Sequence, residues 1–110
     1  MTFKHGRNAA GEGHLMDLSL RGLRFVSEQT LKNGQKIQAR FSLGEAIRMD
    51  LAAVIRHAHR WKGNERIYGI EFFIRDYQDL REHLKLKRFI TETRAKQDEI
   101  LRKQISKEKP

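Results

Sequence analysis

Apolar and polar residues alternate with a period of two through most of the first 75 residues, which is typical of strands buried on one face. Four segments show this alternation, at residues 23–26, 37–43, 49–55 and 68–74. A shorter apolar segment at residues 14–19 adds another candidate strand. We therefore predict a mainly β fold, a small antiparallel β-barrel of five to six strands spaced roughly ten residues apart.

Two turn signals separate these segments. Asn33-Gly34 lies between the segments at 23–26 and 37–43, and Gly63-Asn64 lies between the last two segments. Glycine and asparagine tolerate the positive φ angles that tight turns require. The pattern predicts hairpins at both places, so that neighbours in the sequence are also neighbours in the sheet.

The period changes to three or four residues from Asp76 onward, which indicates a helix. This part of the chain contains no glycine, and its one proline is the final residue, Pro110. Asp76 is the predicted N-cap, with Asp79 as the acidic partner three residues later. The apolar face expected to close over the barrel consists of Leu80, Leu84, Phe89 and Ile90.

These patterns divide the chain into a flexible basic N-terminal arm, a barrel and a long C-terminal helix, at residues 1–12, 13–75 and 76–110. Between residues 91 and 99 of the helix, Ala95 is the one apolar residue. We expect this part of the helix either to fray or to pair with a second copy of the chain. A homodimer through the C-terminal helix is therefore one expected assembly.

Composition narrows the class of protein. The chain has 110 residues, of which 38% are apolar and 34% charged, which suits one small domain. It has no cysteine, which excludes disulfides, thiolate metal sites and a cysteine nucleophile. It has no apolar run near the roughly 20 residues that span a bilayer, and no secretory leader, so we expect a cytoplasmic protein without membrane insertion. Its net charge of +9 favours an anionic partner.

No catalytic constellation stands out in the sequence. Ser19 has no histidine and acid at a recognisable spacing, and there is no glycine-rich phosphate loop. His57 and His59 share one face of a predicted strand, but no further metal ligand lies at a suitable spacing. We therefore expect a binding protein rather than an enzyme, with no metal and no cofactor.

The most informative stretch is DLSLRG, from Asp17 to Gly22. Asp17 and Ser19 lie two apart on a strand and so project from the same face, where they offer a carboxylate and a hydroxyl to one ligand. A guanine base suits this pair, because its N1–H and N2 amine can donate to a carboxylate. Gly22 lets the backbone approach a flat ligand closely. The alternative, that both side chains only satisfy a tight turn, stays open.

At these residues the chain resembles the PilZ family, the bacterial receptors for cyclic di-GMP. The family's second signature, D/N-x-S-x-x-G, matches Asp17, Ser19 and Gly22. The family's closing strand, with its G-x-x-F core, is similar to IYGIEFF at Gly69 and Phe72. The resemblance extends from about Leu15 to Phe73 and implies a six-stranded antiparallel barrel with a C-terminal helix. It also implies that the signature Asp and Ser contact guanine.

The family's first signature, R-x-x-x-R, grips phosphates and is incomplete in this chain. Arg7 is the one arginine ahead of the second signature, and Phe3 stands four residues before it. Either the chain begins after the missing part, or it is a divergent member with a shortened N-terminal edge. We expect Arg7, helped by Lys4, to supply a phosphate contact. Secondary candidates that add positive potential are Arg21 and Arg24.

The resemblance predicts a cyclic di-GMP receptor or adaptor in bacterial signalling. Such a protein transmits the nucleotide signal to a partner protein that controls motility, pili or exopolysaccharide. One alternative is a divergent PilZ domain that binds no nucleotide and serves as a protein interaction module. A second alternative is a non-specific nucleic-acid binder, for which affinity falls steeply with salt. Nucleic acid is the less favoured partner, because the charged residues of the tail alternate in sign.

Overall fold

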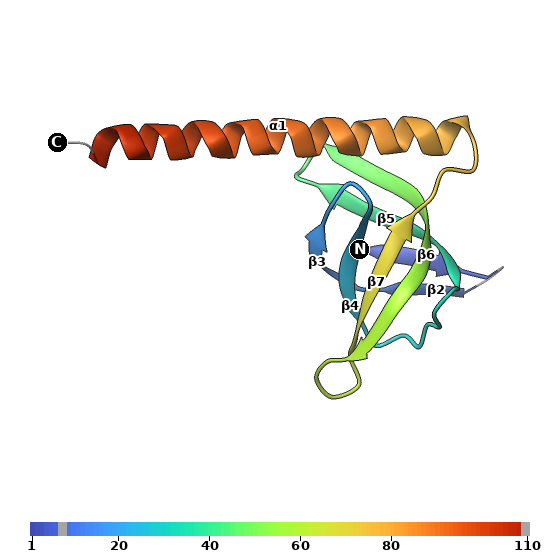
Figure 1. Ribbon diagram of the computed structural model, residues 1–110. Coiled ribbons are helices and arrows are strands. Elements are labelled where there is room, and N and C mark those ends of the chain that lie inside the picture. Colours follow the sequence, from blue (N-terminus) through green and yellow to red (C-terminus); the bar gives the residue numbers. More distant parts are fainter. Residues whose placement is uncertain (7–8, 109–110) are drawn as a thin grey trace.

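The computed structural model describes residues 1–6 and 9–108, with the side chains of the helix described as far as residue 95. In this part of the chain, seven strands are followed by one helix (Figure 1). Their bounds are β1 Thr2–His5, β2 Ala9–Glu12, β3 His14–Leu18, β4 Gly22–Ser27, β5 Lys36–Leu43, β6 Ile47–Arg60, β7 Arg66–Phe72 and α1 Tyr77–Glu108.

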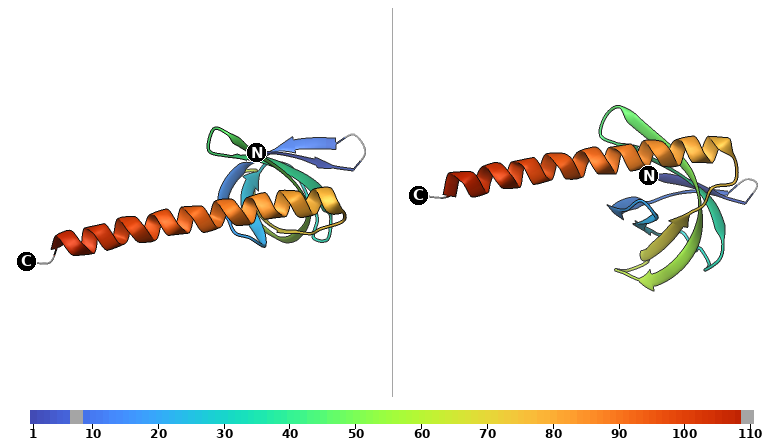
Figure 2. Two further views of the ribbon diagram at one scale, coloured as in Figure 1. Left: turned by 90° about the horizontal axis from the view of Figure 1, so that it is seen from above. Right: turned by 45° about the horizontal axis from the view of Figure 1, so that its top comes forward.

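All the strands belong to one antiparallel sheet in the order β2-β1-β5-β6-β7-β4-β3. The two edge strands, β2 and β3, follow each other in the chain with Gly13 between them. The N–H of Gly13 donates to the carbonyl of Met1, and the amino group of Met1 donates to the carbonyl of Gly13, both at 2.9 Å. The sheet therefore curls into a half-barrel (Figure 2), and the predicted mainly β, antiparallel fold with a C-terminal helix is confirmed.

The N-terminal residues form strands rather than the predicted flexible arm at residues 1–12. β1 pairs with β2 on one side and with β5 on the other. Phe3 is 1% exposed, and its ring packs 5.2 Å from that of Phe25. Gly11, opposite Phe3, leaves room for this ring. The sequence did not reveal these two short strands, because they carry only one large apolar residue and so show no alternation. With them, the sheet has seven strands instead of the predicted five or six.

The core lies on the face of the sheet that the alternation predicted. Tyr68 crosses the core, with its ring 5.4 Å from that of Phe25 and its hydroxyl donating to the carbonyl of Gln29. The same hydroxyl accepts the N–H of Leu31 at 3.0 Å, so the loop between β4 and β5 is fixed to the core. Other fully buried side chains are Met49, Leu51, Ile55 and Leu86.

The two predicted turns have different outcomes. Gly63, with a φ of 55°, lies in the turn of the β6–β7 hairpin, as predicted. Gly34, with a φ of 85°, lies in a turn that joins no hairpin, because β4 pairs with β3 and β7 while β5 pairs with β1 and β6. The chain crosses from one part of the sheet to another here and is anchored by buried Leu31.

Helix α1 starts as the sequence predicted but faces the sheet differently. The Oδ1 of Asp76 accepts the N–H of Asp79 at 2.9 Å, which confirms the N-cap. Leu80 and Leu84, expected to cover the barrel, are 37% and 52% exposed. Leu86 is fully buried in their place. The expectation for these two leucines is wrong, because carboxylates with hydrogen-bond partners occupy the inner face.

Helix α1 lies across one end of the curled sheet, and its C-terminal part extends beyond it (Figures 1 and 2). The part with described side chains, residues 77–95, is about 19 residues long. Phe89 and Ile90 are half-buried against the core, as predicted. In the described part of the chain no helix is both long and apolar enough to cross a membrane. Pairing of the helix with a second copy stays a prediction.

Candidate functional site

The DLSLRG stretch forms the end of β3, a turn and the start of β4. Ser19 closes the turn: its N–H donates to the carbonyl of Gly22 at 2.8 Å, and its Oγ donates to the same carbonyl at 3.2 Å. The N–H of Gly22 donates to the Oγ of Ser19 at 3.3 Å. Ser19 is exposed, but its hydroxyl already bonds backbone groups of the turn. This is what we expect if its side chain serves to satisfy a tight turn.

Asp17 lies opposite Arg24 in the β3–β4 pair. Its Oδ2 accepts the Nε–H of Arg24 at 2.7 Å and also contacts the Nη2. Both side chains are about half exposed, at 49% for Asp17 and 58% for Arg24. The hydrogen bonds from Arg24 lower the pKa of Asp17 below its ordinary value. Asp17 is therefore ionised at neutral pH and can only accept hydrogen bonds.

Packing of the sheet requires glycine at position 22, which the sequence did not reveal. A Cβ at this position would lie 1.8 Å from the carbonyl oxygen of Ile70. Only glycine allows β4 and β7 to approach this closely. Gly69 on β7 differs, since a Cβ there would meet the ring of His57 at an ordinary 3.4 Å. Gly22 is required by sheet packing, whereas Gly69 leaves the surface open.

The signature residues line a shallow groove of about 260 Å³ on the surface of the sheet. We call it the motif groove. It runs from the β3–β4 turn across β4 and β7 to β6, because β7 pairs with both β4 and β6. Its lining residues are Asp17, Ser19, Arg21, Gly22, Leu23, Arg24, Arg56, His57, Gly69, Ile70 and Glu71. Three parts of the chain that are distant in sequence thus form one site.

The sequence prediction missed the β6 side of the motif groove. His57 was considered only as a metal ligand, and Arg56 was not considered. Arg56 pairs with Glu71 at 3.5 Å, and the ring of His57 lies nearly parallel to that of His59 with 6.3 Å between centroids. The register of β6 against β7, which places His57 opposite Gly69, brings this ring to the groove. Alternation within β6 alone does not reveal that register.

The other predicted site residues have mixed positions. Arg21 and Arg24 line the motif groove. Lys4 is exposed on β1, which the sheet order separates from β7 by β5 and β6, and it does not line the groove. Arg7 lies outside the described residues. Within residues 1–6 and 9–95, no group of three or more potential metal ligands comes together.

Larger cavities lie elsewhere on the molecule. One of about 660 Å³, beside β2 and the end of β4, includes Glu12, Glu28 and Glu65 in its lining. Three carboxylates make it unsuitable for an anionic ligand. Another of about 610 Å³, between the sheet and α1, includes Arg40 and Asp50, which pair with each other at 3.3 Å. The smaller motif groove is lined by three arginines and two carboxylates. Arg24 and Arg56 pair with those carboxylates, which leaves Arg21 as the arginine of the groove that forms no ion pair with the described residues.

Comparison with known proteins agrees with this arrangement. The family model described as PilZ domain matches residues 2–92. The match covers all seven strands, the motif groove and the first part of α1. None of the curated proteins compared with the chain matches it.

Proposed function

The chain belongs to the PilZ domain family, and we propose that it is a cyclic di-GMP receptor that binds the nucleotide in the motif groove and signals to a partner protein. The observation that supports this proposal is the meeting of Asp17, Ser19 and Gly22 in one exposed groove lined by arginines. The protein acts by binding, without a reaction of its own and without a cofactor.

Guanine recognition follows from the chemistry of Asp17 and Ser19. The N1–H and N2 amine of guanine donate to the ionised carboxylate of Asp17, and the hydroxyl of Ser19 contacts the same base edge. To reach Asp17, the base displaces Arg24. Two hydrogen bonds from guanine thus replace the two from Arg24, and each hydrogen bond to the charged carboxylate is worth about 1.5–3 kcal/mol. The exchange costs little because Arg24 is 58% exposed and can turn away from the sheet.

The remaining lining residues bind the phosphates and stack on a base of the nucleotide. The displaced Arg24, together with Arg21, pairs with phosphate oxygens through its planar guanidinium. The ring of His57, which is exposed, offers a stacking face at the far side of the groove. Arg7, which lies outside the described residues, stays a predicted further phosphate contact, whereas Lys4 on β1 lies too far along the sheet to line the motif groove.

The proposed signal passes to a partner protein in the cytoplasm of a bacterium. Motility, pili and exopolysaccharide synthesis are the outputs expected for the family. The nucleotide changes the charge and shape of the surface around the β3–β4 turn, because it separates Asp17 from Arg24. A protein that contacts this surface distinguishes the bound state from the free state.

Calorimetric titration of the full chain with cyclic di-GMP tests the proposal. We expect binding in the micromolar range or tighter, weakened about tenfold by Asp17→Ala and less by Ser19→Ala. Glu45→Ala, which removes an exposed carboxylate in the β5–β6 turn, is the matched control and leaves binding unchanged. Unchanged affinity in both signature variants would contradict the assignment of the groove.

The second candidate is a PilZ domain that has lost nucleotide binding and works only as an interaction module. Two observations favour it: Asp17 and Ser19 already have partners within the chain, and the family's first arginine pair is incomplete. This candidate predicts no heat of binding at high nucleotide concentration. It also predicts that removing Asp17 leaves partner binding intact.

A further inference from the structure

In the first turns of α1, the apolar side chains face away from the sheet and two carboxylates face toward it. Tyr77, Leu80 and Leu84 are 74%, 37% and 52% exposed. Asp79 and Glu82, in contrast, are 3% and 8% exposed on the side that packs on the sheet. An amphipathic helix normally buries its apolar side. The reversal indicates that the exposed apolar side has a use of its own.

Hydrogen bonds hold the carboxylates inside. Asp79 accepts the backbone N–H of Arg75 at 2.9 Å and its Nε–H at 2.8 Å. Glu82 accepts the backbone N–H of Asp50 on β6 at 3.0 Å and the ammonium of Lys85 at 2.8 Å. Rotating the helix to bury the leucines would take Glu82 away from the backbone N–H of Asp50 on β6 and would bring its buried carboxylate out of that site, whereas Lys85 would turn with the helix. The apolar residues are therefore held outward.

We call Tyr77, Leu80 and Leu84 the outer stripe. Their spacing is i, i+3 and i+7, so they form one line about 10 Å long on the helix surface. This is the anchor spacing with which a helix inserts into an apolar groove of another protein. In Figures 1 and 2 no other element covers the side of α1 that faces away from the sheet. The outer stripe is thus presented without obstruction by the described part of the chain.

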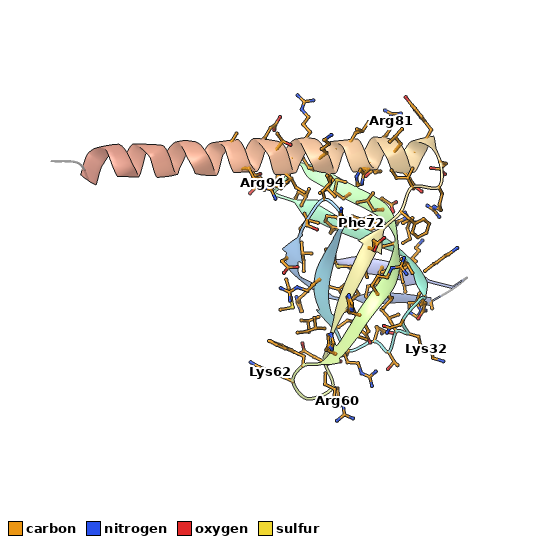
Figure 3. All side chains as sticks on the ribbon, in the orientation of Figure 1. Lys32, Arg60, Lys62, Phe72, Arg81 and Arg94 are labelled. Atoms are coloured by element: carbon orange, nitrogen blue, oxygen red, sulfur yellow. The ribbon has the colours of Figure 1, made fainter. Side chains whose placement is uncertain are left out.

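The charged residues around the outer stripe indicate which kind of partner groove the stripe fits. Figure 3 shows Arg81 on the side of α1 away from the sheet, and in the sequence Arg81 directly follows Leu80 of the outer stripe. The exposed basic side chains in residues 77–95 are Arg81, Lys85, Lys87, Arg88 and Arg94, against one exposed acidic side chain, Glu92. Glu92 pairs with Arg88 at 3.2 Å. Within the described residues, no carboxylate forms an ion pair with Arg81.

We infer that the outer stripe docks into an apolar groove of a partner protein, with aspartate or glutamate side chains along the rim of that groove. The inference rests on the adaptor part of the proposed function and not on nucleotide binding. A second copy of this chain fits poorly, because antiparallel packing around the stripe brings the two Arg81 side chains together. A bilayer fits poorly as well, because three apolar side chains bury little area.

Photo-cross-linking of the full chain in its native host tests the inference. Benzoylphenylalanine at position 84 should form a covalent product with one protein, and its matched control at exposed position 64, in the β6–β7 turn, should not. The cross-linked peptide should lie in an apolar groove with an acidic rim. Arg81→Glu should lower the yield about tenfold, and a lysine in place of the opposing acid should restore it.

Several outcomes would overturn the inference. They are a product with a second copy, co-sedimentation of the purified chain with phosphatidylglycerol vesicles through the stripe, no product specific to position 84, and no rescue by charge exchange. With benzoylphenylalanine kept at position 84, the variant Tyr77→Gln/Leu80→Gln should lose the product yet keep its melting temperature, because both side chains are exposed. Its nucleotide titration, measured in parallel, shows separately whether the proposed nucleotide site fails.

Discussion

Two aspartate–arginine pairs in this protein have the same chemistry and opposite surroundings. In the motif groove, Asp17 pairs with Arg24, and the carboxylate is 49% exposed. At the start of α1, Asp79 pairs with Arg75, and the carboxylate is 4% exposed. In both pairs the hydrogen bonds from arginine lower the pKa of the aspartate.

The difference lies in what else holds each carboxylate. Asp79 also accepts the backbone N–H of Arg75, and its own N–H donates to Asp76, so it is part of the helix start. Asp17 accepts side-chain hydrogen bonds from Arg24 alone among the described residues. The buried pair is therefore structural, whereas the exposed pair is free to exchange Arg24 for a ligand. Exposed ion pairs contribute little to stability, so this exchange does not endanger the fold.

The largest expected effect is the difference in stability between alanine substitutions at two glycines of the motif groove. Gly22→Ala should destabilise the protein by about 3 kcal/mol, because its Cβ meets the backbone carbonyl of Ile70. Gly69→Ala should change stability by less than about 1 kcal/mol, because its Cβ meets only the ring of His57. Urea unfolding measures both. Equal stabilities would show that β4 and β7 can move apart, and the structural role of Gly22 would be wrong.

A smaller effect separates the two aspartates. Asp79→Ala should lower the free energy of unfolding by about 2 kcal/mol, because Arg75 and the helix start lose their acceptor. Asp17→Ala should lower it by no more than about 0.5 kcal/mol. Urea unfolding of both variants, with Asp79→Asn as a control that keeps one acceptor oxygen, makes the comparison. If Asp17→Ala were the more destabilising variant, the groove would be a structural site.

Much of the fold was predictable because its signals are local. Alternation located the strands β4 to β7, and the short polar side chain of Asp76 identified the start of α1. The strand pairing of β4 with β7 was not predictable, because the turn at Gly34 occurs in a crossing loop as readily as in a hairpin. The strands β1 and β2 were missed because Phe3 is their one large apolar residue, and a single residue cannot show a repeating apolar pattern.

The site was predictable only on its β3–β4 side. The signature residues identified Asp17 and Ser19, and the groove contains both. The contribution of His57 depends on the register between β6 and β7, which includes an irregularity between Ile55 and His57. The rotation of α1 depends on distant partners of its carboxylates, such as the backbone N–H of Asp50. Such contacts are visible only once the chain is folded.

The smallest effect is the pH dependence of the buried pair. The folded protein lowers the pKa of Asp79, so the unfolded chain takes up a proton first as pH falls through about 3.9. The stabilisation from Asp79 is therefore complete above about pH 5 and is lost as pH falls through the lower folded pKa.

The stability difference between wild type and Asp79→Ala should consequently shrink between pH 5 and pH 2, as measured by urea midpoints at several pH values. The corresponding difference for Asp17→Ala should be small at pH 5 and smaller still in 0.5 M salt, because solvent and ions screen an exposed pair. A difference for Asp79→Ala that stays constant down to pH 2 would mean that its carboxylate gains nothing from Arg75. The two pairs would then be distinguished by backbone hydrogen bonds alone, and the ionised state of Asp79 would have no part in holding α1 in its reversed orientation.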